Sequence, residues 1–175
     1  WEEKKDTLPA DHPARYALVE LVNLHDPSLE FEAIHRVVFD INPQSVVEAL
    51  KTYYPEIEIS DRPQNPAEKE HHFTIVTPTG DLYSLLKNPP CNLSVGSLQK
   101  FLDAFLEENA GKIDYIHGED AVRENVSETA IGFLLPTMTK DELFETVVKD
   151  GVLPRKTFSM GHAEDKRFYL EARKI

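Results

Sequence analysis

The amino-acid sequence predicts an α+β fold, in which three to four helices pack on a mixed, largely antiparallel β-sheet. Apolar segments separated by turn residues come early in the chain, and strand and helix patterns alternate later. The composition of the 175 residues, 41% hydrophobic and 29% charged, is typical of a globular domain with a buried core. We therefore expect residues 1–175 to form a single domain. Because the chain opens on Trp1 within a helix-like run, we expect this domain to be a fragment of a longer protein.

The first third of the chain contains two expected strands and a helix. Residues 15–24 are apolar and partly β-branched, which favours a strand. The Asp and Pro within residues 25–28 favour a tight turn. Residues 31–39 form the second expected strand, with alternate side chains on opposite faces. A helix should follow, because Asn42 is a favourable N-cap and Pro43 suits the first helical position.

The middle of the chain predicts a hairpin and a long helix. The expected strands cover residues 57–59, 71–78 and 82–86. The last two are joined by a Thr-Gly-Asp turn. Residues 60–70 contain two prolines and no apolar period, so we expect a mobile loop there. An amphipathic helix should begin near Ser94 or Ser97, either of which could act as its cap, and end near residue 109.

The last third alternates strands and helices. The expected strands cover residues 113–116, 129–135, 157–160 and 166–172, and the expected helices cover residues 118–125 and 139–149. Thr139 and Glu142 have the spacing of a capping box, in which each side chain satisfies a backbone amide at the start of the helix. Asp150-Gly151 should end this helix.

The charge distribution limits the classes of function. The formal net charge is −12, and residues 151–175 alone carry +3, so the first 150 residues carry −15. Nucleic-acid binding needs a broad basic face, which this balance disfavours. Cys91 is the only cysteine, which excludes an intrachain disulfide and suits the cytoplasm. We also expect no membrane association, because no apolar stretch approaches the roughly 20 residues that span a bilayer.

Compact motifs for metals and nucleotides are not found in the sequence. His71 and His72 are adjacent in an expected strand and should point to opposite faces, so they cannot bind one metal ion together. The chain lacks a His-Glu-x-x-His pair, a GxGxxG or Walker-type loop and a nucleophile elbow. We therefore expect no metal site.

His35 and Arg36 lie in the middle of the expected strand at 31–39. An arginine between apolar residues of a central strand is costly unless it meets a carboxylate or a bound anion. Arg36 is therefore a candidate anion ligand, and His35 is a candidate group for proton transfer. The structural alternative is an ion pair for Arg36 and a hydrogen-bonded core imidazole for His35.

Residues 152–167 concentrate cations and hydroxyl groups in an otherwise acidic chain. Arg155 can offer a planar fork and Lys156 a point charge, a combination suited to phosphate or carboxylate. Thr157 and Ser159 should share one strand face and could orient the anion. His162 is a second candidate for proton transfer, although alternation places it on the opposite face. The structural alternative is a solvated hairpin with ordinary surface charge.

The order of these landmarks resembles the bacterial and archaeal family catalogued as domain of unknown function 1015. The resemblance rests on HPARYALVELVNLHDPSLEFEAIHR, HHFTIV, IDYIHGEDAV and AIGFLLPTMTKDELFETVVKDGVLPRKTF, which together extend from about residue 12 to residue 167. The match marks His35, Arg36, Pro136, Thr137, Pro154, Lys156 and Thr157. The chain departs from the family in having Leu153 before its proline, and it lacks an aromatic–Pro–Lys ending after Thr157.

The resemblance implies that residues 1–175 are the C-terminal part of a longer enzyme-like protein. The resemblance also implies, upstream of this region, a motif similar to the nucleotide-phosphate loop of the ParB/sulfiredoxin superfamily, whose relatives include a free-serine kinase. The implied function is the handling of a small anionic metabolite, with phosphoryl transfer on a serine-like substrate as the most concrete form. ATP or ADP with Mg²⁺ would then bind the full-length protein, with no cofactor in this part alone.

Two further partners follow from this interpretation: the protein's own N-terminal domain and a second copy of the chain. The rival interpretation is a non-catalytic interaction, dimerisation or regulatory domain. A DNA-linked role is suggested only by the ParB relationship, and the net charge of −12 argues against it.

Overall fold

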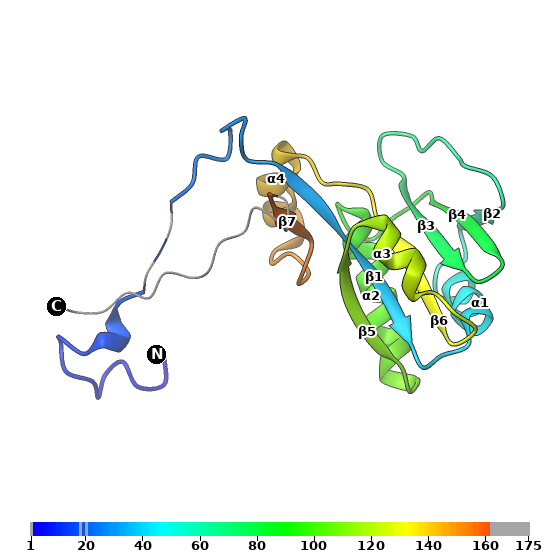
Figure 1. Cartoon of the computed structure of the whole chain (residues 1–175). Coiled ribbons are helices and arrows are strands. Elements are labelled where there is room, and N and C mark those ends of the chain that lie inside the picture. The colour runs from blue at the N-terminus through cyan, green and yellow to red at the C-terminus, as the bar shows by residue number, and fades with distance from the viewer. Residues whose placement is uncertain (1, 18, 20, 162–175) are drawn as a thin grey trace.

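The computed structural model describes residues 2–17, 19 and 21–161 and has the expected α+β fold (Figure 1). The strands are β1 (Phe31–Phe39), β2 (Ile57–Ser60), β3 (His71–Thr77), β4 (Gly80–Leu86), β5 (Lys112–His117), β6 (Ala130–Leu134) and β7 (Phe158–Met160). The helices are α1 (Pro43–Tyr53), α2 (Ser94–Glu108), α3 (Glu119–Asn125) and α4 (Lys140–Asp150), and a short 3-10 helix covers Pro13–Arg15.

The described strands form one antiparallel sheet in the order β2-β4-β3-β6-β1-β5, with β7 paired to the start of β1. The long strand β1 therefore contacts three others, which suits its continuous burial from Ile34 to Val38. A strand that is buried on both faces has a nearly continuous apolar sequence, and the buried part of β1 has such a sequence apart from two residues. Those two residues are His35 and Arg36.

Helices cover both faces of the sheet. Figure 1 shows α3 in front of the sheet and α1 and α2 behind it. One buried cluster joins α1 and α2 to the sheet through residues such as Val46, Leu98 and Phe133. A smaller cluster places Val122 of α3 against Val37 of β1. Two layers of helix thus exclude water from the centre of β1.

Two of the three expected helix caps are present. The Asn42 side chain accepts a hydrogen bond from the Gln44 amide (2.8 Å), as expected of an N-cap. The capping box of α4 is present, and the Glu142 carboxylate accepts from the Thr139 amide (2.7 Å). The expected serine cap of α2 is wrong, because the N-cap residue is Leu93 and Ser94 is already helical.

The expected strand at 15–24 is also wrong in the described residues. Arg15 belongs to the 3-10 helix, and the described residues that follow it have no strand pairing. Figure 1 shows this part of the chain away from the sheet, and Leu21 is 99% exposed. The apolar, β-branched pattern is favourable for a strand, but a strand also needs a neighbour that completes its hydrogen bonds.

Residues 61–70 lie between β2 and β3 without regular structure, as expected of a loop, whereas Ser60 still belongs to β2. The expected strand at 166–172 lies outside the described residues. Within the described residues, no helix is long and apolar enough to cross a membrane.

Candidate anion-binding site

Arg36 is fully buried at the centre of the fold, with an exposed fraction of 0%. Its Nε donates to Gln99 Oε1 of α2 (3.3 Å), Nη2 donates to the Arg155 carbonyl (3.2 Å), and Nη1 donates to the Ile34 carbonyl. The guanidinium carbon lies 5.1 Å from the centre of the Tyr115 ring. All of these partners are neutral. The expected structural ion pair is therefore wrong, since Arg36 forms none with a described carboxylate.

Arg36 is buried without a described carboxylate in direct contact, and Asp103 compensates its charge only in part. Loss of hydration lowers the pKa of Arg36 to about 10, against smaller raising contributions from Tyr115 and Asp103. The side chain stays protonated at neutral pH. Its positive potential is screened little in such a buried setting, so a bound anion nearby would be favoured.

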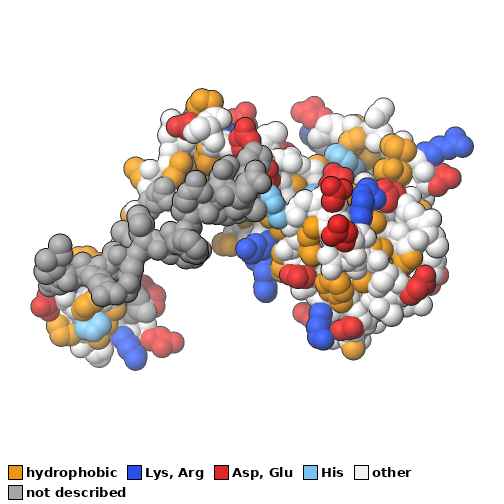
Figure 2. Space-filling model, viewed as in Figure 1, with side chains coloured by type: hydrophobic (Ala, Val, Ile, Leu, Met, Phe, Trp, Pro, Cys, Tyr) orange, Lys and Arg blue, Asp and Glu red, His pale blue; other side chains and the backbone are white. Residues whose placement is uncertain are grey.

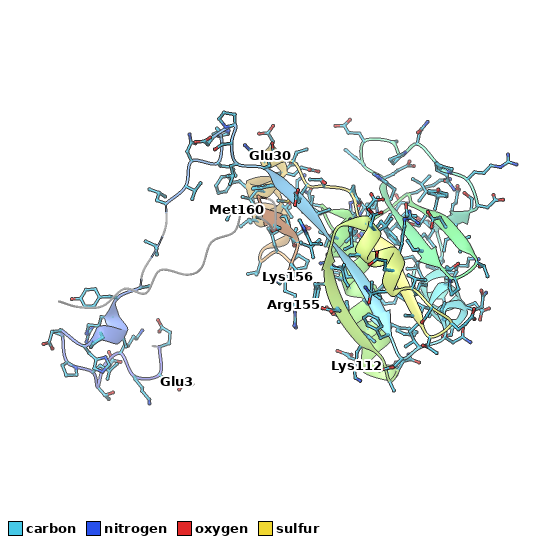
Figure 3. All side chains as sticks on the ribbon, in the orientation of Figure 1. Glu3, Glu30, Lys112, Arg155, Lys156 and Met160 are labelled. Carbon is cyan, nitrogen blue, oxygen red and sulfur yellow. The ribbon has the colours of Figure 1, made fainter. Side chains whose placement is uncertain are left out.

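The bond from Arg36 to the Arg155 carbonyl fixes the loop that enters β7. Figure 3 shows Arg155 and Lys156 on this loop, between α4 and β7. Lys156 has a positive φ of 56°, and the Thr157 hydroxyl donates to the Pro154 carbonyl (2.6 Å). The loop is thus a tight turn held from inside by Arg36. Both the Arg155 and Lys156 side chains are exposed, and neither forms a hydrogen bond or ion pair with a described residue.

A cavity of about 440 Å³, here called the first cavity, lies between α2 and this loop. Its charged wall residues are Lys100, Asp103, Lys149, Asp150 and Arg155. Two of them are already engaged, because Lys149 Nζ donates to Asn92 Oδ1 (3.0 Å) and Asp150 accepts from the Asn92 amide (2.6 Å). Lys100 and Arg155 are the cations that remain available to a ligand.

A larger second cavity of about 940 Å³ borders the loop before β3, the start of α2 and α4. Its wall contains Thr157 together with Pro136 and Thr137, which the sequence also marked. Two of its lysines, Lys87 and Lys149, pair with glutamates. The cations of the second cavity are therefore largely neutralised, and the first cavity is the better anion site.

The remaining anion-binding candidates do not meet at one cavity. Arg155 borders the first cavity, Thr157 borders the second, and Lys156 borders neither. Ser159 is buried in β7 opposite Glu32 of β1. Glu32 in turn forms an ion pair with His117 of β5. The Arg36 side chain contacts the backbone of the loop at the Arg155 carbonyl, and Arg36 acts on the first cavity only through its positive charge.

His35 has a hydrogen-bonding role within the fold. Its Nδ1 accepts from the Leu135 amide (3.1 Å), which satisfies a backbone donor just past the end of β6. Burial is the main factor that lowers the pKa of His35. The arrangement fits the structural alternative of a core imidazole, and a proton-transfer role for His35 stays a prediction. His162 lies outside the described residues.

We expect His35 to make the protein less stable in acid. The folded state favours the neutral imidazole because its pKa is lowered, whereas the unfolded chain takes up a proton near the ordinary pKa of about 6.5. The contribution of neutral His35 to the free energy of unfolding is therefore complete above pH 6.5 and is lost as the pH falls below 6.5. In His35→Asn the side-chain oxygen can still accept from Leu135. As the pH falls, the free energy of unfolding of this variant should decrease less steeply than that of the original protein. The two slopes should differ by up to about 1.4 kcal/mol per pH unit.

Urea unfolding between pH 7 and 5 measures this difference. The exposed histidine His25 provides the control, because His25→Asn should retain the slope of the original protein. Equal slopes for His35→Asn and the original protein would show that His35 does not couple folding to protons.

Sequence reasoning missed three residues of the first cavity: Lys100, Gln99 and Asp103 of α2. Gln99 is only 6% exposed, so it is a polar residue on the buried side of the helix next to Leu98 and Leu102. An amide side chain beside the apolar positions Leu98 and Leu102 was the signal in the sequence that could have pointed to Gln99. Lys100 and Asp103 carried none, since they resemble ordinary solvated charges. Figure 2 shows acidic and basic groups interspersed over the visible face of the molecule.

The fold is shared with solved structures. A conserved hypothetical protein from Pyrococcus furiosus matches with a TM-score of 0.59 and 16% identity, over 81% of this chain and 60% of that chain. A free serine kinase mutant in complex with AMP matches with a TM-score of 0.59 and 20% identity, over 80% of this chain and 57% of the kinase chain. The chain thus spans 60% or less of the length of either protein. A comparison with curated proteins found no match.

The family model described as "Protein of unknown function (DUF1015)" matches residues 1–105. This match covers more than half of the 175 residues and agrees with the resemblance seen in the sequence motifs. The chain therefore belongs to the DUF1015 family.

Proposed function

We propose that the first cavity binds a small phosphate-bearing or carboxylate-bearing metabolite, and that this binding serves phosphoryl transfer. The observation that carries the proposal is the buried cation Arg36, which has no described carboxylate in direct contact and holds the Arg155 carbonyl at the edge of the cavity. Arg155 and Lys100 would hold the anion. A serine-like metabolite is the specific substrate we propose.

The size and chemistry of the cavity support this assignment. A volume of about 440 Å³ falls in the range of small-molecule sites. Arginine presents a planar fork that matches the geometry of phosphate and carboxylate, and lysine adds a point charge. In phosphoryl transfer the protein acts mainly through positioning and charge neutralisation, which are the roles available to these cations.

The likeness to a free serine kinase bound to AMP supports the reaction class at the level of fold. A shared fold can host unrelated activities, so the argument depends on the cavity itself. ATP or ADP with Mg²⁺ is the proposed phosphoryl donor or acceptor pair. Proteins commonly hold Mg²⁺ through one or two carboxylates together with the phosphates of a nucleotide, so the ion would bind as part of the Mg²⁺–nucleotide complex.

Calorimetric titration tests the proposal. The purified chain is titrated with inorganic phosphate, ATP, ADP, serine and phosphoserine at low ionic strength, where charge interactions are least screened. We expect binding of at least phosphate and phosphoserine. Heats indistinguishable from dilution for all five compounds would overturn the proposal.

A second candidate function, an interaction or dimerisation domain, is favoured by an apolar ridge on α4. Phe144 is 67% exposed and Val148 is 85% exposed, and they lie one turn apart on the outer face of the helix. Val147 is also exposed, whereas only Thr146 of this helix is buried. A helix normally buries its apolar side, so this ridge has the character of a contact surface.

We expect Phe144→Ser to reduce self-association if the ridge joins two copies of the chain. Light scattering coupled to size-exclusion chromatography would then show a dimer for the original protein and a monomer for the variant. Folding should be retained, because Phe144 is exposed. Leu21→Ser, which removes another exposed apolar side chain outside α4, is the matched control and should leave self-association unchanged. If the original protein and Phe144→Ser are both monomeric at concentrations up to about 100 times those used for binding assays, the ridge does not join two copies of the chain.

A further inference from the structure

A chain of hydrogen bonds links the buried Arg36 to the wall of the first cavity. Arg36 Nε donates to Gln99 Oε1 (3.3 Å), and Gln99 Nε2 donates to Asp103 Oδ1 (2.7 Å). Gln99 and Asp103 lie one turn apart on α2, at the spacing that lets their side chains meet. These two hydrogen bonds, here called the relay, connect the centre of the sheet to the wall of the first cavity through side chains of α2.

The direction of this relay is fixed by the chemistry of its ends. A guanidinium group has only donors and an ionised carboxylate has only acceptors, so the Gln99 amide has one orientation that satisfies both. Rotating the amide by half a turn would place its NH2 group against Arg36 and its oxygen against Asp103. Gln99 is also nearly fully buried, which holds the amide in place.

Asp103 is consequently a carboxylate with one oxygen held and one oxygen available. Oδ1 accepts from Gln99, and no hydrogen bond or ion pair with a described residue involves Oδ2. Asp103 is exposed and borders the first cavity, one turn from Lys100. A single ligand in this cavity would thus meet two available cations, Lys100 and Arg155, and one available carboxylate.

We propose that Asp103 binds the ammonium group of a ligand whose phosphate is held by Arg155 and Lys100, and that Gln99 is the positioning residue for this carboxylate. A neutral ligand would leave Asp103 Oδ2 without a ligand contact, and a purely anionic ligand would also bring its negative charge close to the carboxylate. The ligand class is therefore a phosphorylated primary amine. This inference rests on the proposed function, because it assumes that the first cavity holds the anion.

A matched pair of ligands separates the two contributions. Phosphoethanolamine and n-propyl phosphate have nearly the same shape, but only the first carries an ammonium group. We expect calorimetry at low ionic strength to show that the original protein binds phosphoethanolamine about two- to fivefold more tightly, which is the upper part of the range for a solvent-exposed ion pair. Asp103→Asn should remove this preference and leave n-propyl phosphate bound as tightly or more tightly. Gln99→Met should reduce the preference while affinity for n-propyl phosphate is retained.

The outcomes distinguish this inference from the function on which it rests. If the original protein binds neither ligand, the anion site itself is wrong. If it binds both equally, or if Asp103→Asn keeps the preference, the anion site stands and the role of Asp103 is overturned. Asp103 is exposed, so Asp103→Asn should fold normally, and its thermal unfolding temperature provides the check.

Discussion

Replacement of Arg36 by methionine is expected to lower the free energy of unfolding by about 3 kcal/mol. Methionine can follow the aliphatic part of the arginine side chain but lacks the guanidinium group at its end. The cost comes from three acceptors that lose their donor together: the buried Gln99 side-chain oxygen and Ile34 carbonyl, and the partly buried Arg155 carbonyl. Relief of the unpaired buried charge offsets part of this cost, because Arg36 is desolvated without a carboxylate partner.

Two further variants show whether the loss of stability comes from the charge of Arg36 or from its hydrogen bonds. Arg36→Lys keeps the charge but lacks the planar fork, so it should still destabilise the protein by about 2 kcal/mol. Lys112→Met, on the neighbouring strand β5, removes an exposed cation paired with the exposed Asp40 and should change stability by about 0.5 kcal/mol or less. Urea unfolding measures all three. An unchanged or increased stability of Arg36→Met would mean that the desolvated charge outweighs its hydrogen bonds.

The fold was largely readable from the sequence because most elements carry local signals. The Asn42 cap, the Thr139–Glu142 capping box and the turn before β4 depend on neighbouring residues alone. The segment at 15–24 shows the limit of such signals. Its composition favours a strand, but strand formation is decided by a partner elsewhere in the fold, and no such pairing occurs in the described residues.

The candidate site was only partly readable, for a related reason. The sequence indicated that Arg36 needs a compensating partner, but its partners lie at residues 34, 99 and 155, and two of these depend on the tertiary fold. The run at 155–159 appeared as one anion site because its cations and hydroxyls are adjacent. In the structure the Arg36 bond and the turn at Lys156 divide these side chains between two cavities and the surface.

This division yields the prediction with the largest expected effect on binding. Arg155→Gln should weaken phosphate binding at least tenfold, because it removes the planar cation at the first cavity. The fold should be unaffected, because Arg36 contacts the backbone carbonyl of residue 155 and that carbonyl remains. Calorimetry measures the affinity, and thermal unfolding checks that the variant is as stable as the original protein.

Lys156→Gln is the matched control for this effect. It removes the same charge from the adjacent position, but Lys156 is exposed and borders neither cavity. We expect a loss of less than about twofold, the part due to long-range attraction, and this part should vanish at about 0.5 M salt. The loss caused by Arg155→Gln should persist there, because a direct hydrogen-bonded contact is screened less than a distant charge. Equal losses in the two variants would mean that the loop attracts anions only through its net charge, and that the first cavity holds no defined site.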